Sequence, residues 1–180
     1  CMVSGGYILV GDSAWMPKPI DAGGIGPALI AGTILGKNVV DAIEANDVTE
    51  KGLWQYNLDF IEEYGYKTAG LELFRRLVQT LTNEQISYGM KHFLGNVDVE
   101  AISKGEHPDF SGLSKLGMII RGAMNKTVAN GLKYTSQQNQ WLVEHYRNYP
   151  KEPEGFEEWE KSLHKTLDES FAKIASFSKN

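Results

Sequence analysis

The sequence of 180 residues contains a single cysteine, Cys1. One cysteine excludes an internal disulfide framework and a metal site built from several thiolates, and it agrees with a reducing compartment. The chain also lacks an apolar run of about 18 residues, the length that a membrane-spanning helix needs. Its start has neither the basic residues nor the apolar length of a signal peptide. We therefore expect a cytoplasmic protein.

Basic clusters and recognisable catalytic motifs are missing as well. The net charge of −5 leaves no basic patch to neutralise a phosphate backbone, which excludes nucleic acid as a partner. Ser13 lies outside the G-x-S-x-G motif of serine hydrolases. The four histidines are spread along the chain without the spacing of a helical metal site: His92, His107, His145 and His164. The sequence thus predicts no metal site and identifies no catalytic residue.

The most informative stretch is the beginning of the chain. Residues 7–10 form a short apolar run that glycines bound on both sides, and this pattern predicts a buried strand. Gly11 then permits a tight turn or a close approach of the backbone to a ligand. Asp12 follows at the carboxyl end of the strand, the edge at which open α/β sheets bind their ligands.

A helical pattern begins at Pro27 after an irregular loop. Apolar and small residues recur at three- and four-residue spacing as far as Ile43, and we expect the helix to end near Asn46. Its small residues would let it press against a sheet or a flat cofactor. The free amides of residues 24–26 would point out of the helix start, where the partial positive charge favours an anion or an electron-rich carbonyl.

The segment GYILVGDSAWMPKPIDAGGIGPALIAG, residues 6–32, resembles the last FAD-contacting segment of the flavoprotein monooxygenase-like reductases. The resemblance is to the archaeal geranylgeranyl reductases in particular, close to the electron-transfer-flavoprotein dehydrogenase-like oxidoreductases. It implies that Asp12, next to Gly11, binds the ribityl hydroxyls of FAD. It further implies that Pro19 passes near the isoalloxazine ring.

The same resemblance places Gly23, Gly24 and Ile25 at the pyrimidine side of the flavin. Fixed dipoles of the helix start would there stabilise the negative charge that develops on reduction. The implied activity of the intact enzyme is the reduction of isoprenoid lipid double bonds with FAD. Its implied partners are an isoprenoid lipid or a redox partner, and the intact enzyme could associate peripherally with a membrane.

Two features depart from the family pattern. The loop of residues 15–19 is bulkier and more basic than the usual small-residue version. The nucleotide-binding G-x-G-x-x-G fingerprint, which such enzymes carry near the N-terminus, is missing. We therefore expect the chain to be the C-terminal portion of a longer flavoprotein and to be inactive by itself. Residues 1–46 would be the last piece of the FAD-binding domain, and residues 47–180 a helical C-terminal region.

The remainder of the chain is predicted to be helical, which makes the fold class mainly α with one short N-terminal strand. Thr49 and the capping box at Thr82 mark two helix starts. Glycines at 65 and 70 predict a bend or two successive helices there. Helices are expected over residues 127–146 and 155–174, joined by a proline-containing linker. Residues 113–124, rich in isoleucine and methionine, are a candidate wall for a long apolar substrate.

Other interpretations remain open. A strand, a glycine turn and a small-residue helix occur in many α/β proteins. The intact protein could be an electron-transfer dehydrogenase or a hydroxylase on the same fold, and a complete 180-residue gene product would favour a non-catalytic helical interaction module. Separated from its N-terminal remainder, the strand at residues 7–10 would be unpaired, and we expect self-association or disorder there.

Overall fold

The structure, a computed structural model, describes residues 1–91 and 125–177. It is mainly helical, with one short hairpin near the N-terminus, as the sequence predicts. The elements in chain order are β1 (Val3–Ser4), β2 (Tyr7–Ile8), the 3₁₀ turn η1 (Gly11–Ala14), α1 (Ile25–Glu44), α2 (Glu50–Leu53), α3 (Gln55–Phe60), the π-helical turn η2 (Ile61–Gly65), α4 (Tyr66–Thr68), α5 (Leu71–Thr80), α6 (Asn83–Gly89), α9 (Lys126–Arg147), the 3₁₀ turn η5 (Pro153–Gly155) and α10 (Phe156–Phe177).

The predicted strand is shorter and more exposed than the sequence suggests. Of residues 7–10, only Tyr7 and Ile8 form a strand, which is β2. This strand pairs antiparallel with β1 in the register Ser4↔Tyr7, and the Tyr7 side chain is 58% exposed. Gly5 and Gly6 form the turn, and Gly6 takes a φ of 81° that other residues avoid. The expectations of a buried strand and of an unpaired one are therefore both wrong. Gly-Gly between two short extended runs was a hairpin signal.

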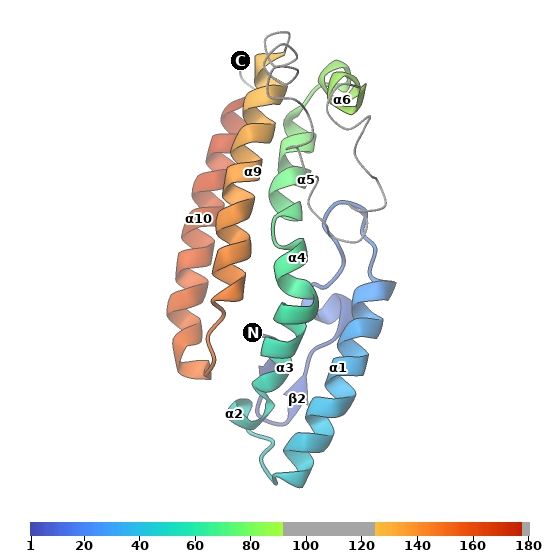
Figure 1. Ribbon diagram of the computed structural model, residues 1–180, viewed down its shortest axis with the longest axis vertical. Helices are drawn as coiled ribbons and strands as arrows, with labels where there is room; N and C mark the ends of the chain where they lie inside the picture. The colour runs from blue at the N-terminus through green and yellow to red at the C-terminus, as the bar shows by residue number, and fades with distance from the viewer. Residues whose placement is uncertain (92–124, 178–180) are drawn as a thin grey trace.

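Helices are arranged in layers around the central run α3–η2–α4–α5 (Figure 1). The antiparallel pair α9 and α10 packs on one side of this run through α5, while α1 packs on the other side through α3. Two apolar clusters form the core. The first consists of Val3, Met16, Ala31, Ala42, Leu53, Trp54, Tyr56 and Phe60, and the second of Leu73, Leu77, Leu142, Leu163 and Ile174.

Local signals account for most helix boundaries. Thr49 caps α2 by accepting a hydrogen bond from the Gly52 amide, and Thr82 forms the predicted capping box with Gln85 at the start of α6. Helix α1 ends two residues before Asn46, which adopts a left-handed φ of 51°. The linker before α10 is a tight connection between antiparallel helices.

Helix α1 exposes apolar residues on the side opposite its core contacts. Ala31 and Ala42 are buried on its inner face. Its outer face carries Ile25, Leu29, Gly32, Gly36, Val40 and Ile43, of which Ile25 is 80%, Leu29 69%, Val40 53% and Ile43 62% exposed. These six positions follow at three- or four-residue steps, so they form one continuous row, called here the outer stripe of α1.

Candidate functional site

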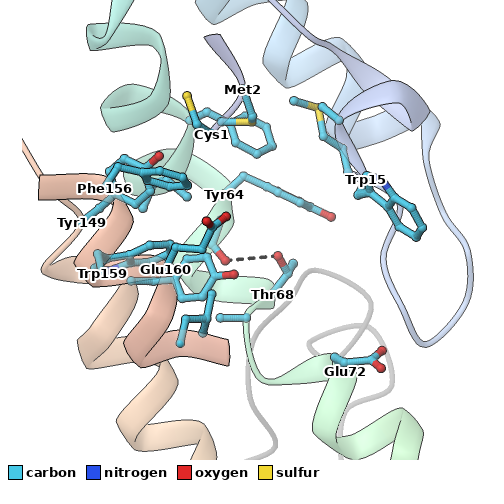
Figure 2. A pocket seen from close by; sticks show the side chains of 18 of the residues that line it. Cys1, Met2, Trp15, Tyr64, Thr68, Glu72, Tyr149, Phe156, Trp159 and Glu160 are labelled. Carbon is cyan, nitrogen blue, oxygen red and sulfur yellow. Dashed lines mark hydrogen bonds between the residues drawn. The ribbon is translucent and has the colours of Figure 1, made fainter. Parts of the chain in front are cut away.

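The loop between β2 and α1 closes around a buried methionine. Met16 is 5% exposed, its sulfur accepts a hydrogen bond from the Gly11 amide at 3.1 Å, and its own amide donates to the Gly11 carbonyl at 3.3 Å. Gly11 takes a φ of 68° to make this turn. The anchored methionine leaves Trp15, which is 93% exposed, pointing away from the protein (Figure 2).

The next part of the loop is held by hydrogen bonds of its own. Lys18 accepts from the Ala22 amide at 2.9 Å and donates its amide to the Gly23 carbonyl at 3.3 Å. The Lys18 ammonium pairs with Asp21 at 3.0 Å. A hydrogen bond from the Gly23 amide, assisted by Lys18, lowers the pKa of the Asp21 carboxyl group. Asp21 is thus an ionised brace that fixes the turn leading into α1.

The start of α1 meets the end of the hairpin at Gly24. A Cβ atom on Gly24 would lie 3.2 Å from the Asp12 Oδ1 atom and 3.2 Å from Pro17 Cγ, so only glycine leaves Asp12 undisturbed. No side chain caps this helix start, and Ile25 projects into solvent. The exposed Asp12 carboxylate therefore lies directly beside an uncapped helix N-terminus, and we call the place where Gly11, Asp12 and Gly24 meet the corner.

Of the six residues predicted to contact FAD, the structure brings Gly11, Asp12 and Gly24 into this corner. Gly23 adjoins it within the braced turn, where its Cβ would lie 3.0 Å from Lys18 Cε. Ile25 opens the helix next to it. Pro19 lies apart from the others, because it faces a cavity on the inner side of the loop.

That inner cavity has a volume of about 340 Å³ and separates the loop from the helical layers. Loop residues Met16, Pro17 and Pro19 form one wall, and Tyr64 reaches toward them from η2. Figure 2 shows Trp159 and Glu160 of α10 on the opposite side, with Glu72 of α5 at the lower edge. The cavity is thus enclosed by segments from both ends of the chain.

Several titratable side chains line this cavity, and two of them, Tyr64 and Glu72, face opposite electrostatic environments. Burial, with Asp21 assisting, raises the pKa of Tyr64 to about 12, and its hydroxyl has no hydrogen-bond partner within the residues that the structure describes. Glu72 is held differently. Burial works to raise its pKa, but hydrogen bonds from Arg75 and Arg76 at 2.7 and 2.8 Å keep that pKa below its ordinary value. Near neutral pH the cavity therefore presents a protonated phenol and a paired carboxylate.

Met16 and Tyr64 are the residues that sequence reasoning did not assign to the site. Met16 belongs to the bulky loop of residues 15–19, and Tyr64 lies in a helical pattern whose aromatic residues fit either a helix core or the lining of a lipid pocket. The helical periodicity gave no sign that the Tyr64 hydroxyl would face the loop. Its position depends on η2, where a π-helical turn shifts the side chains relative to a regular helix.

Comparison with known proteins identifies relatives of this chain. No family model matches it. It is 34% identical over 170 residues to the digeranylgeranylglycerophospholipid reductase of Sulfolobus acidocaldarius, covering 93% of this chain and 37% of that protein. The enzyme of the same name from Methanocella arvoryzae is 30% identical over 100 residues, 56% of this chain and 25% of that protein. Digeranylgeranylglycerophospholipid reductase 2 of Methanopyrus kandleri is 29% identical over 101 residues, with coverage of 56% and 25%.

The relatives are much longer than the chain, which spans 37% of the Sulfolobus acidocaldarius enzyme and a quarter of the other two. The resemblance noted in residues 6–32 to geranylgeranyl reductases is confirmed by these matches, and the strongest of them extends it over nearly the whole sequence. The chain is thus homologous to digeranylgeranylglycerophospholipid reductases, and the similarity to the Sulfolobus acidocaldarius enzyme covers 93% of its length.

Proposed function

We propose that this chain is the C-terminal portion of an FAD-dependent oxidoreductase that reduces carbon–carbon double bonds of an isoprenoid lipid. Its relatives are digeranylgeranylglycerophospholipid reductases. Similarity over 93% of this chain supports a shared activity of the intact proteins. The observation that carries the cofactor assignment is the backbone corner at Gly11, Asp12 and Gly24.

The residues of this corner fit a flavin cofactor. The Asp12 carboxylate is exposed, so it is available to accept hydrogen bonds from ribityl hydroxyls. The uncapped amides at the start of α1 can donate to the carbonyl edge of the ring. Glycines at 23 and 24 keep side chains away from the approach, since a Cβ on either would lie within 3.2 Å of a neighbouring side chain. In this assignment Gly23, Gly24 and Ile25 line the pyrimidine side, and Pro19 supports the loop beneath the ring.

The residues of this chain would bind and orient the cofactor. A bound flavin would supply the hydride for reduction of the double bond. Of the titratable side chains that line the inner cavity, Tyr64 has a pKa raised to about 12 and Glu72 is held ionised by two arginines, while Glu160 and His164 of α10 also line it.

The outer stripe of α1 fits a place inside a larger protein. Four large apolar side chains of this row are between 53% and 80% exposed, and glycines between them permit close contact. The Sulfolobus acidocaldarius relative has 63% of its length outside the match (100 − 37). In our proposal the N-terminal remainder of the flavoprotein covers this stripe, and residues 1–46 complete the FAD-binding domain.

The test uses the full-length protein in which this chain is preceded by its N-terminal remainder. Asp12→Ala should weaken FAD binding roughly ten- to a hundredfold, because charge-assisted hydrogen bonds to the ribityl chain are lost. Gly24→Ala should have a similar effect, because its methyl group would displace Asp12 and obstruct the helix start. Binding is measured by flavin fluorescence quenching during titration of the apoprotein.

Asp168→Ala and Glu169→Ala are the matched controls, because both residues are exposed on α10, away from the corner and from the outer stripe of α1. They should bind FAD like the unchanged protein. Unaltered FAD affinity in both Asp12→Ala and Gly24→Ala would contradict the assignment of the corner. A full-length protein that binds no flavin would contradict the proposed function itself.

A further inference from the structure

A second, smaller cavity lies between α5, α6 and α9, with Ile20 of the loop before α1 at its edge. It has a volume of about 230 Å³. Its lining residues are apolar side chains and one glycine: Ile20, Phe74, Leu77, Val78, Leu81, Ile86, Gly89, Met90, Val128 and Leu132. We call it the α5–α6–α9 groove. Figure 1 shows α6 beside the upper ends of α5 and α9, which together frame this region.

The floor of the groove is rigid. Leu77 is 0% and Val128 is 1% exposed, so both are fixed by packing between α5 and α9. The two helices approach closely at Gly131, where a Cβ atom would lie 2.5 Å from Leu77 Cδ1. Since no lining side chain can form a hydrogen bond other than through the thioether of Met90, a polar ligand would lose its hydration without compensation. The groove therefore suits a hydrocarbon.

One wall of the groove comes from the loop assigned to the flavin. Ile20 lines the groove, and its neighbour Pro19 lines the inner cavity on the other side of the same loop. A ligand in the groove would thus touch the loop that, by the proposed function, lies under the isoalloxazine ring. Among apolar ligands, this position favours the chain of the substrate over an unrelated lipid.

We propose that the α5–α6–α9 groove binds part of the isoprenoid chain of the substrate; this inference depends on the proposed function. An apolar cavity of about 150 Å³ holds one benzene molecule, so the groove can hold roughly two five-carbon isoprene units. Hydrocarbon burial supplies the affinity. The rest of the chain would extend past Ile20 toward the flavin. The candidate substrate wall at residues 113–124 lies outside the described residues and is not part of this proposal.

Gly89→Leu provides a specific way to block the groove. Gly89 lines the groove, and a Cβ at this position would make an ordinary contact of 3.6 Å with Val128 Cγ1, so the substitution begins without a backbone clash and adds a branched side chain at the wall of the groove. Leucine is also a better helix former than glycine, so α6 should be retained. Ser87→Leu is the matched control. It adds the same side chain to α6 at an exposed position that does not line the groove.

Binding is measured on the 180-residue chain with ¹³C-labelled methionine methyl groups, using geranylgeraniol as the probe. Met90 lines the groove, whereas Met16 is buried in the first apolar cluster and serves as an internal reference. We expect saturable shifts of the Met90 signal in the unchanged chain and in Ser87→Leu. In Gly89→Leu the dissociation constant should rise at least tenfold.

Several outcomes would overturn the proposal. Equal binding by Gly89→Leu, shifts at Met16 in place of Met90, or no binding of geranylgeraniol would each exclude the groove as the isoprenoid site. Hexadecanol, a straight-chain alcohol, tests the ligand class, and binding as tight as that of geranylgeraniol would show a general lipid site. Because these titrations need no cofactor, a full-length protein without FAD affinity would contradict the proposed function and leave the groove result standing.

Discussion

Two tyrosines, Tyr56 and Tyr64, show how the fold treats polar groups in its apolar interior. Both lie in or against the first apolar cluster, and burial raises the pKa of each to about 12, with Asp21 adding to the effect at Tyr64. Their hydroxyl groups differ. That of Tyr56 donates to the Leu9 carbonyl at 3.3 Å and ties α3 to the N-terminal hairpin, whereas that of Tyr64 has no partner among the described residues. A buried polar group without a partner costs stability.

Tyr64→Phe should therefore stabilise the chain. Removing an unsatisfied hydroxyl is expected to raise the free energy of unfolding by roughly 1 kcal/mol. Tyr56→Phe is the matched control and should lower it by about 1 kcal/mol, because the Leu9 carbonyl loses its donor. Urea denaturation followed by circular dichroism measures both changes. Destabilisation by Tyr64→Phe would show that this hydroxyl is satisfied.

The same phenols make stability depend on alkaline pH. Their pKa of about 12 in the folded chain exceeds the ordinary value of 10.0, so the folded state binds these protons more tightly than the unfolded state. The resulting stabilisation is complete below pH 10 and is lost as the pH rises through about 12. Thermal denaturation midpoints should accordingly fall across this window, together with a rise in tyrosinate absorbance. Titration of all tyrosines near pH 10 with unchanged stability would contradict this expectation.

Among the helical elements, the central run α3–η2–α4–α5 is interrupted between α4 and α5, where it contacts α9. The break between α4 and α5 falls at Gly70, which is buried against Asn139. A Cβ on Gly70 would collide with the Asn139 side chain and lie 3.0 Å from its Cβ. The glycine thus permits α9 to cross the run closely at this point, and the sequence-predicted interruption has a packing cause.

Gly70→Ala should destabilise the chain by roughly 1–3 kcal/mol, because the added methyl group overpacks the contact with α9. Gly36→Ala, in the open outer stripe of α1, has nothing within 4 Å of the new Cβ and should stabilise by about 0.5–1 kcal/mol. The double variant Gly70→Ala/Asn139→Ala should recover part of the loss. Free energies of unfolding from urea titrations test all three. Equal effects of the two glycine substitutions would argue against the close contact.

For the whole molecule, the segment at Trp54 is joined to the connection between α9 and α10. The Trp54 indole donates to the Pro150 carbonyl at 2.8 Å, and its ring stacks on Tyr149 with the centroids 5.8 Å apart. His145 lies between Trp141 and Trp159 with its ring parallel to both. The linker before α10 is therefore a packed junction. No helix within residues 1–91 and 125–177 combines the length and apolar character needed to cross a bilayer.

The outer stripe of α1 should make the isolated chain self-associate. An apolar row of this extent on a protein surface favours burial against another molecule. Leu29→Lys combined with Ile43→Lys should lower the sedimentation coefficient toward that of a monomer. Lys133→Glu, at an exposed position of α9, should leave the sedimentation coefficient unchanged. A monomeric unchanged chain at high concentration would refute this prediction. In the full-length protein, where we propose that the stripe is covered, the double substitution should instead reduce expression of folded enzyme.

The helices and several of their ends can be predicted from local sequence patterns. The capping residues Thr49 and Thr82, the stop at Asn46 and the last two helices follow from patterns within a few residues of each other, and the structure confirms them. The predicted burial of the N-terminal strand is wrong, because burial depends on contacts with residues far along the chain, which no local pattern reports.

The sequence by itself determined the helical class, the helix starts and the order of strand, Gly-Asp turn, glycine loop and small-residue helix, since these depend on backbone preferences and capping. Only the tertiary structure decided that Asp12 meets Gly24, that Tyr64 faces the loop without a partner, that Gly70 admits α9 and that one row of α1 stays exposed. Such contacts join residues that packing alone brings together, and packing depends on the whole set of side-chain shapes.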